Sequence, residues 1–573
     1  MNKSFLNILL LIILLSFNSS ILLSNELITK NNEIRITNSE YSETDPEIIV
    51  NPIDSNNLIS SSIQHKLNYG VDHFINAISY SLDKGLTWNR YQKEVFPSEK
   101  YRMLSNARDN KIIFDSYGKA HLVWLTTLIK TGFGGIDSVI QLVTYRYSTN
   151  KGIDWNELDE NIDRVKSNYD VSKVFNGLNE TFSNLKLIEY NHNVYISYSV
   201  HSTYEHKASI NLVDLRNPKS KINIKLPSKF TYLGNYDLKI KDNKVHIAFL
   251  SNDKYPFDRQ VLEYFVYDLL TKNIENHTNI AEVNFMGSTL IPGVISYVLP
   301  GLPTEFINPN PLINFINDTI LLSWYGADYS KEVRFPKNNV YICKGIDGVF
   351  GKAKKVFRDL SHHQCNYDLK INDNGVIIVN YYNLEGPFES SGTKFNYNVE
   401  PRFTLSFDKG ETFKNPITYV SNSFELTHTL NRNFKYGIGY KTGISIDNND
   451  IYLTWTDGRL QNGNTEIYSS VYPIRYDLNK LFNKENIKIN VNNIYPNPFS
   501  NQITIEMDNY KIQNINIFLC DYNGKIIKYL YDGHIKVGLN NLIFDLESIA
   551  EGNYFLNFKT DGEVIYKKLI KVN

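Results

Sequence analysis

The central part of the chain repeats one short pattern of apolar and polar positions. An alternating apolar segment is followed by a turn of Asp, Asn or Gly, and then by a second apolar segment that often ends in an aromatic residue. Alternation with a period of two, bounded by such turn residues, predicts antiparallel β-hairpins. Clear copies begin at residues 112, 187, 237, 313, 369 and 444, and a weaker copy begins at residue 48.

Two of these hairpins share the literal string Asn-Tyr-Asp-Leu-Lys-Ile, at 235–240 and 366–371, an offset of 131 residues (366 − 235). Two repeats within that offset give a period of about 65 residues, which suits a four-stranded unit with loops. Seven hairpin units between residues 45 and 478 predict an all-β fold. A seven-bladed β-propeller is favoured, because its blades leave only short, protected edges. A six-bladed ring stays open as an alternative, because the first copy is weak.

Three segments between the hairpins share a second pattern. Residues 81–88 read Ser-Leu-Asp-Lys-Gly-Leu-Thr-Trp, residues 406–413 read Ser-Phe-Asp-Lys-Gly-Glu-Thr-Phe, and residues 148–155 form a weaker copy. In such a turn the Asp carboxylate can accept hydrogen bonds from its own backbone, and Gly supplies a left-handed conformation without strain. The pattern resembles the Asp box, or BNR repeat, of sialidase-like β-propellers.

This resemblance implies that the turns are structural and lie away from a substrate face. The residues concerned are Ser81, Asp83, Gly85, Thr87, Trp88, Ser406, Asp408, Gly410, Thr412 and Phe413. We therefore expect Asp83 and Asp408 to hold their turns rather than to act as catalytic acids.

The sequence does not assign the catalytic residues of a sialidase. Sialidases carry a Phe-Arg-Ile-Pro-like segment ahead of the first Asp box, which supplies one of the arginines that clamp the substrate carboxylate. Here Ile34-Arg35-Ile36-Thr37 matches that segment only in part. Spacing along the chain identifies neither a nucleophilic Tyr with its Glu partner nor an acid Asp.

The last hairpin carries three candidate ligand-binding residues, Trp455, Asp457 and Arg459. Their segment resembles the closing blade of secreted sialidase-like repeat proteins of Bacteroidetes. Asp457 and Arg459 can present a charged pair to a ligand, but we favour an Asp-Gly turn with a locally paired Arg. Adjacent His362 and His363 would face opposite sides of a strand, so we expect no metal site and no cofactor.

The first residues predict export. Met1-Asn2-Lys3 is a short basic start, and Phe5–Phe17 is an apolar run that is too short to span a bilayer but suits a signal peptide. We place the signal peptide at residues 1–24, without an exact cleavage site. No later apolar stretch has the length of a transmembrane helix.

The C-terminal segment occupies residues 494–573, after a charged, Asn-rich linker at 479–493. Its distinctive residues are Tyr495, Pro496, Asn497, Pro498, Gly552, Tyr554, Lys567 and Lys568. With these residues in this order, the segment resembles the sorting domain of cargo proteins of the type IX secretion system of Bacteroidetes. The resemblance implies a small β-sandwich, the type IX machinery as partner, and a mature protein that passes the periplasm and is secreted or held at the outer-membrane surface.

Composition narrows the function further. The chain has 60 basic and 61 acidic residues, a net charge of −1, so nothing indicates nucleic acid or an anionic membrane as partner. Three cysteines, Cys343, Cys365 and Cys520, are too few for a disulfide scaffold, and pairing of the first two stays open. We predict a secreted propeller that binds a glycan or a protein without catalysis. The alternative is a divergent exo-α-sialidase or another glycoside hydrolase acting on extracellular glycans.

Overall fold

The computed structural model describes most of the chain beyond residue 32. The described residues are 33–68, 71–91, 103–132, 135–156, 160–168, 180–202, 208–226, 232–252, 260–283, 310–327, 338–357, 362–390, 394–429, 437–460, 464–474, 490–509, 513–521, 524–535, 538–560 and 564–572. The predicted signal peptide lies outside them. The chain divides into two compact units, Lys30–Pro473 and Ile474–Asn573.

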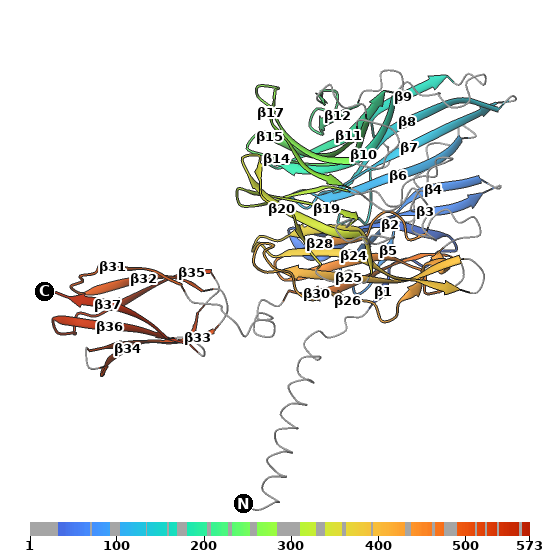
Figure 1. Ribbon diagram of the computed structural model, residues 1–573. Helices are drawn as coiled ribbons and strands as arrows, with labels where there is room; N and C mark the ends of the chain where they lie inside the picture. Colours follow the sequence, from blue (N-terminus) through green and yellow to red (C-terminus); the bar gives the residue numbers. More distant parts are fainter. Residues whose placement is uncertain are drawn as a thin grey trace, which may run out of the picture. The chain divides into compact units, whose positions relative to one another are not determined.

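The larger unit consists of successive antiparallel sheets (Figure 1). In chain order their strands are β2 (Ser42–Asn51), β3 (Asp54–Asn68), β4 (Val71–Ser81) and β5 (Asn89–Arg90); β6 (Met103–Phe114), β7 (Ala120–Gly132), β8 (Gly135–Ser148) and β9 (Glu160–Asn168); β10 (Glu180–Tyr190), β11 (Asn193–Ser202), β12 (Ala208–Asp214) and β13 (Lys221–Lys225); β14 (Tyr232–Lys241), β15 (Lys244–Asn252), β16 (Gln260–Asp268) and β17 (Ile274–Val283).

The remaining sheets of this unit follow in the same way. Their strands are β18 (Leu312–Ile316), β19 (Thr319–Ala327), β20 (Asn338–Ile346), β21 (Val349–Phe350) and β22 (Lys354–Lys355); β23 (His363–Ile371), β24 (Ile377–Ser390), β25 (Lys394–Ser406), β26 (Ile417–Thr418) and β27 (Phe424–Glu425), with the short 3-10 helix η1 (Leu426–Thr429); and β28 (Gly443–Ile446), β29 (Asp450–Asp457) and β30 (Glu466–Pro473) with β1 (Ile34–Arg35).

The sheets close into a ring. In the described residues the first strands β2, β6, β10, β14, β18, β23 and β28 contact one another in turn, and β28 contacts β2. The first two sheets of the ring are also joined by a single parallel bridge between Phe74 on β4 and Asn106 on β6. The N-terminal strand β1 pairs with β30, placing Arg35 opposite Tyr468, so the start of the domain completes its last sheet. This arrangement confirms the predicted all-β propeller, and β1 lies ahead of the boundary expected at residue 45.

Each sheet has two distinct ends. The turns that join first to second strands and third to fourth strands lie at one end, because consecutive strands are antiparallel. The three predicted Asp boxes all fall there, between β4 and β5, between β8 and β9, and between β25 and β26. We call this the Asp-box end. The connections from second to third strands lie at the opposite end.

Tyrosines fill much of the space between neighbouring sheets. Tyr236 on β14 is 1% exposed, and its hydroxyl lies 2.6 Å from the Ser197 hydroxyl of the preceding sheet. Tyr367 on β23 repeats the contact, at 3.1 Å from the Ser323 hydroxyl. A buried Tyr needs such a partner for its hydroxyl, so these pairs join one sheet to the next.

The smaller unit contains two packed sheets, β31-β32-β35 and β34-β33-β36-β37. Their strands are β31 (Asn490–Tyr495), β32 (Gln502–Asn509), β33 (Gln513–Cys520), β34 (Ile526–Ile535), β35 (Gly538–Asp545), β36 (Gly552–Lys559) and β37 (Val564–Lys571). One apolar core that includes Ile505, Ile517 and Leu556 lies between the sheets, which makes the unit a β-sandwich. Its first strand begins four residues before the predicted boundary at 494 (494 − 490).

Residues 479–489 of the predicted linker lie outside the described residues. Among the residues that are described, no helix has the length and hydropathy needed to cross a membrane.

Candidate functional site

The first and third Asp boxes along the propeller have the same hydrogen bonds. Asp83 Oδ1 accepts from the Ser81 hydroxyl at 2.7 Å and from the Thr87 N–H at 2.9 Å, while Oδ2 accepts from the Thr87 hydroxyl at 2.5 Å. The Gly85 N–H donates to Ser81 Oγ at 2.8 Å. Lys84 and Gly85 have φ angles of 63° and 85°, so the turn needs a left-handed glycine.

Ser406, Asp408, Gly410 and Thr412 repeat these contacts in the turn after β25. Hydrogen bonds from the Thr hydroxyl and N–H lower the pKa of both Asp carboxyls, although burial acts in the opposite direction. Each carboxylate is thus held ionised by its own turn, which supports a structural role.

The weaker copy keeps the geometry with different chemistry. The Asn150 side-chain oxygen takes the place of the carboxylate, accepting from the Asp154 N–H at 2.9 Å. The Asn150 amide then donates to the Asp154 carboxylate at 3.1 Å, where a Thr hydroxyl donates in the other boxes. In this copy Asn replaces the Asp of the box and Asp replaces the Thr. The side-chain hydrogen bond between the two positions therefore runs in the opposite direction, and the turn keeps its shape.

The aromatic residues of the boxes anchor the turns to the sheets. Trp88 Nε1 donates to Ser469 Oγ on β30 at 3.1 Å, which links the first sheet to the last. Trp155 is 3% exposed and donates to the Gly152 carbonyl at 3.2 Å. Phe413 is half-buried.

The candidate ligand-binding residues of the last sheet contact one another at the opposite end. Trp455 is fully buried and donates from Nε1 to Asp457 Oδ2 at 2.7 Å. Arg459 Nε lies 2.9 Å from the same Asp457 oxygen, and its Nη1 pairs with Glu33. The burial of Trp455 leaves no ring face for a ligand, and the charges of Asp457 and Arg459 are satisfied within the chain.

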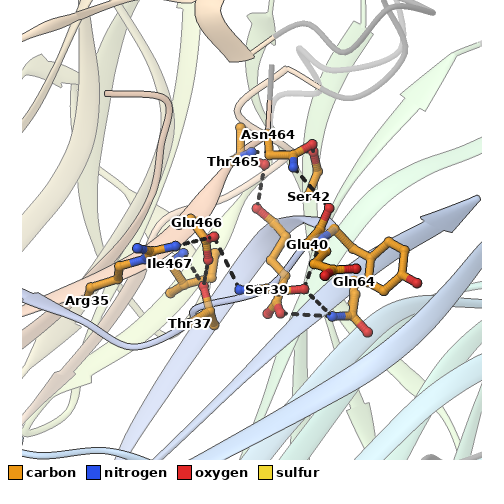
Figure 2. Close-up of polar contacts among 12 residues, drawn as sticks. Arg35, Thr37, Ser39, Glu40, Ser42, Gln64, Asn464, Thr465, Glu466 and Ile467 are labelled. Carbon is orange, nitrogen blue, oxygen red and sulfur yellow. Dashed lines mark hydrogen bonds and ion pairs between the residues drawn. The ribbon is translucent and has the colours of Figure 1, made fainter. Parts of the chain in front are cut away.

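Arg35, the arginine of the segment that partly matches the sialidase motif, belongs to a group of polar residues at the closure of the ring, which we call the seam. We define the seam as Arg35, Thr37, Ser39, Glu43 and Glu466. Arg35 Nη2 lies 2.6 Å from Glu466 Oε1, and the Thr37 hydroxyl donates to Oε2 at 2.5 Å. The Ser39 N–H donates to Oε1 at 3.3 Å. Figure 2 shows these contacts converging on Glu466.

A second buried carboxylate, Glu43, lies in the same seam. Its oxygens receive Arg90 Nη1 at 2.6 Å, the Ser62 hydroxyl at 2.6 Å and Gln64 Nε2 at 3.2 Å. Gln64 also donates to Ser39 Oγ at 2.8 Å, so the two carboxylates are joined by one network (Figure 2). Burial raises the pKa of Glu43, and Glu466 acts in the same direction, while Arg90 and Ser62 oppose them.

Beside the seam, two arginines lie near one tyrosine. Arg35 is the cross-strand partner of Tyr468, and the Arg459 guanidinium lies 4.7 Å from the centre of the Tyr468 ring. Asp457 and Glu466 are opposite each other on β29 and β30. Within the described residues, Arg35 Nε and Arg459 Nη2 are buried and have no hydrogen-bond acceptor.

Sequence reasoning missed Glu43 and Glu466. Their partners lie far away in the chain: 431 residues separate Arg35 from Glu466, so no local spacing could show the pair. Glu43 had no clear local signal either, since it is one of three acidic residues at 42–47 in β2, with Asp45 and Glu47.

Charged side chains also project from the first strands toward the axis of the ring. Glu47 on β2 accepts Lys111 Nζ at 2.7 Å and Lys441 Nζ at 2.6 Å from the two neighbouring sheets. Its other oxygen accepts the Ile112 N–H at 3.1 Å. Burial acts to raise the pKa of Glu47, but the two ammonium groups lower it to about 2. Burial lowers the pKa of Lys441 to about 8, against the attraction of Glu47.

The histidine and cysteine candidates form no metal centre in the part of the chain that is described. His363 is buried in β23, and His362 lies 3.9 Å from Glu385. No group of three His, Cys, Asp or Glu side chains there is arranged to hold a metal ion. Cys343 and Cys365, whose pairing the sequence left open, are buried free thiols, as is Cys520, and burial raises the pKa of Cys343 to about 12.

Asn497, one of the sorting residues, joins the segment after β31 to the last strand, β37. The Asn497 amide donates to the Lys568 carbonyl at 2.9 Å and accepts the Ile570 N–H at 2.9 Å. Tyr495 and Asn497 each precede a cis proline, Pro496 and Pro498.

The other sorting residues divide between the core and the surface. Tyr554 is 8% exposed and its hydroxyl donates to the Ala550 carbonyl at 2.8 Å. Gly552 has a φ of 156°, while Lys567 and Lys568 are exposed on β37.

One family of known proteins matches the smaller unit. Residues 493–572 match the family described as "Secretion system C-terminal sorting domain". This match confirms the predicted sorting domain, and it shows that the chain is exported to the cell surface or the extracellular space by the type IX machinery. No curated protein matches the chain.

Solved structures resemble the chain distantly. A protein of unknown function from Dyadobacter fermentans is 10% identical over 78% of this chain and 99% of its own, with a TM-score of 0.37. The phage phi92 endosialidase is 9% identical over 82% and 72%, with a TM-score of 0.38. An α-L-arabinanase from Penicillium chrysogenum is 14% identical over 78% and 98%, with a TM-score of 0.34. The propeller is established by the order and the contacts of the chain's own sheets.

Proposed function

We propose that the propeller acts outside the cell as a binding module for a glycan and does not cleave it. The observation that supports binding over hydrolysis is that the arginines in and beside the seam are already paired with carboxylates. Arg35 and Arg90 are ion-paired with the buried carboxylates Glu466 and Glu43, and Arg459 is paired with Asp457. A glycoside hydrolase needs carboxyl groups that can act on the scissile bond, and a sialidase also needs arginines that are free to hold the substrate carboxylate.

An exposed aromatic residue at the opposite end offers a surface for sugars. Tyr440 precedes β28 and is 43% exposed, and its N–H donates to the Asp45 carboxylate. A fixed backbone with an exposed ring suits stacking on an apolar sugar face.

A glycan array, combined with pull-downs from cell-wall or host material, tests this function. We expect a defined set of glycans to bind, and Y440A to weaken that binding. Y117A is the matched control, because Tyr117 is also exposed, at 69%, but lies in a turn at the Asp-box end. Silence in both assays would contradict glycan binding. Capture of protein alone would favour a protein-binding module instead.

A divergent exo-α-sialidase is the second candidate, and one observation favours it. Arg35 lies opposite Tyr468 in the strand register, Arg459 lies over the Tyr468 ring, and Asp457 faces Glu466 on the same strands. These residue types could hold an acidic sugar. Release of a fluorescent group from a sialoside, lost in R35Q and R459Q, would support this activity. R216Q is the control, because Arg216 pairs with Asp214 on an exposed turn. No release by the unsubstituted protein would refute it.

A further inference from the structure

The axis of the propeller carries a second group of charged residues beside the Glu47 pairs. We call it the axial lysine cluster: Lys186, Asp237, Lys239, Asp368 and Lys370. These residues lie on β10, β14 and β23, the first strands of their sheets.

The position of Lys239 follows from its neighbours. Leu238 is 1% exposed and packs in the core between sheets, so alternation along β14 turns Lys239 to the other side. There Lys239 feels the charges of Lys186, from the preceding sheet, and of Lys370, from the sheet two places further round. Three sheets can bring charges together in this way only near the axis of the ring.

The ammonium groups of the cluster have few acceptors. Each can donate three hydrogen bonds. Lys186 Nζ lies 3.5 Å from Asp237 Oδ1, and Lys370 Nζ lies 3.3 Å from Asp368 Oδ2. Among the residues that the structure describes, none forms a hydrogen bond or an ion pair with the Lys239 ammonium. The Glu47 pairs on the same axis are much closer, at 2.6 and 2.7 Å.

Each of the two carboxylates of the cluster accepts a hydrogen bond from a backbone N–H. Asp237 Oδ2 accepts the Ile313 N–H of the next sheet at 2.8 Å, and Asp368 Oδ1 accepts the Leu369 N–H at 2.8 Å. With three lysines and two aspartates the cluster has a net charge of +1 (3 − 2). Burial lowers the pKa of Lys239. At Lys370 burial acts in the same direction, but Asp368 and Glu47 outweigh it and raise the pKa. Lys239 is therefore the less compensated of these two ammonium groups.

We propose that the axial lysine cluster binds one small oxyanion, a sulfate, a phosphate or the carboxylate of a sugar acid, with Lys239 as its main ligand. The oxyanion would accept hydrogen bonds from ammonium groups of three sheets and would neutralise the excess charge. This site goes beyond the proposed function, because it lies on the axis and does not require a glycan at Tyr440.

Equilibrium dialysis of the purified protein tests the proposal. Labelled sulfate, phosphate and glucuronate are compared at pH 7, with sodium chloride holding the ionic strength constant. We expect saturable binding of one anion per chain, and the arm that binds tightest distinguishes an inorganic ion from a sugar acid. K239M and K370M should each weaken binding about tenfold or more, the effect of losing one charge-assisted hydrogen bond.

K241M is the matched control on the same strand. Lys241 Nζ donates to the Asn317 carbonyl at 2.7 Å and to Asp318 Oδ1 at 2.8 Å, so K241M should bind the anion as the unsubstituted protein does. The anion should also raise the thermal midpoint of the unsubstituted protein and of K241M, but not that of K239M. Absence of saturable binding of all three anions would overturn the proposal. Undiminished affinity in K239M or in K370M would do so as well.

Discussion

The E47Q substitution should lower the free energy of unfolding of the propeller by about 3 kcal/mol at pH 7. Glu47 is 18% exposed and joins three sheets through Lys111, Lys441 and the Ile112 N–H. Its pKa of about 2 lies below the ordinary glutamate value of 4.5. At about 1.4 kcal/mol for each pH unit between the two values, the difference corresponds to about 3 kcal/mol.

The sign of the pH dependence follows from the lowered pKa. A carboxyl whose pKa is lower in the folded state than in the unfolded state stabilises the folded protein. This stabilisation is complete above the pKa of the carboxyl in the unfolded state, and it is lost as the pH falls toward its pKa in the folded state. The difference between the unsubstituted protein and E47Q should therefore stay near 3 kcal/mol at pH 5 and fall to about 2 kcal/mol at pH 3.5.

Urea unfolding followed by tryptophan fluorescence measures this difference. All five tryptophans lie between residues 88 and 455, so the signal reports the propeller and not the sorting domain. E411Q is the control, because the pKa of Glu411 is also lowered to about 2, by Lys344 and Lys354. Its side chain is 54% exposed.

Water and salt screen the exposed pairs of Glu411, so E411Q should cost less than about 1 kcal/mol and lose its effect at high salt. Equal costs for E47Q and E411Q would refute the reasoning. A cost of E47Q that does not decrease from pH 7 to pH 3.5 would refute it too.

Three further predictions concern the turns and the sorting domain. D83A and D408A should each lower the propeller's free energy of unfolding by about 1–3 kcal/mol, because each removes hydrogen bonds from a Thr N–H, a Thr hydroxyl and a Ser hydroxyl; unchanged urea midpoints would contradict this. N497A should speed hydrogen exchange of the β37 amides near Ile570 without affecting the propeller, because it removes the two hydrogen bonds between Asn497 and β37. Protection equal to that of the unsubstituted protein would show that these bonds do not hold β37. Deletion of residues 495–573 should leave the propeller folded in the periplasm, so its appearance at the surface by cell fractionation would exclude the sorting role.

The turns were predictable from the sequence because their chemistry is local. Ser81, Asp83, Gly85 and Thr87 lie within one turn and bind one another, so the spacing alone carries the geometry. The sorting motif was recognisable for the same reason, although the contact of Asn497 with β37 spans 71 residues.

The seam could not be predicted because its partners come from the two ends of the propeller. Arg35 stood out only as part of an incomplete motif, and nothing near it in the chain identifies Glu466. The choice between a ligand-binding and a locally paired Arg459 also needed coordinates, since Glu33 lies 426 residues away.

The repeated string Asn-Tyr-Asp-Leu-Lys-Ile shows how a sequence can encode contacts between sheets as well as hairpins. In both copies the Tyr hydroxyl meets a Ser of the preceding sheet. The Asp of the first copy, Asp237, binds the backbone of the next sheet. The Leu packs in the core, and alternation then directs the Lys to the axis.

The intervening first strand, β18, is preceded by Asn310-Pro311 where the string has Asn-Tyr. None of its five residues is charged, so it brings no charge to the axis. The repeat therefore recurs two sheets apart. Its two lysines face the axis with Asp237 and Asp368 near both, Lys186 near the first and Glu47 near the second. A charged residue that alternates with core residues on the first strand of a sheet therefore indicates a side chain that faces the axis of the ring. This pattern is visible in the sequence at Lys239 and Lys370.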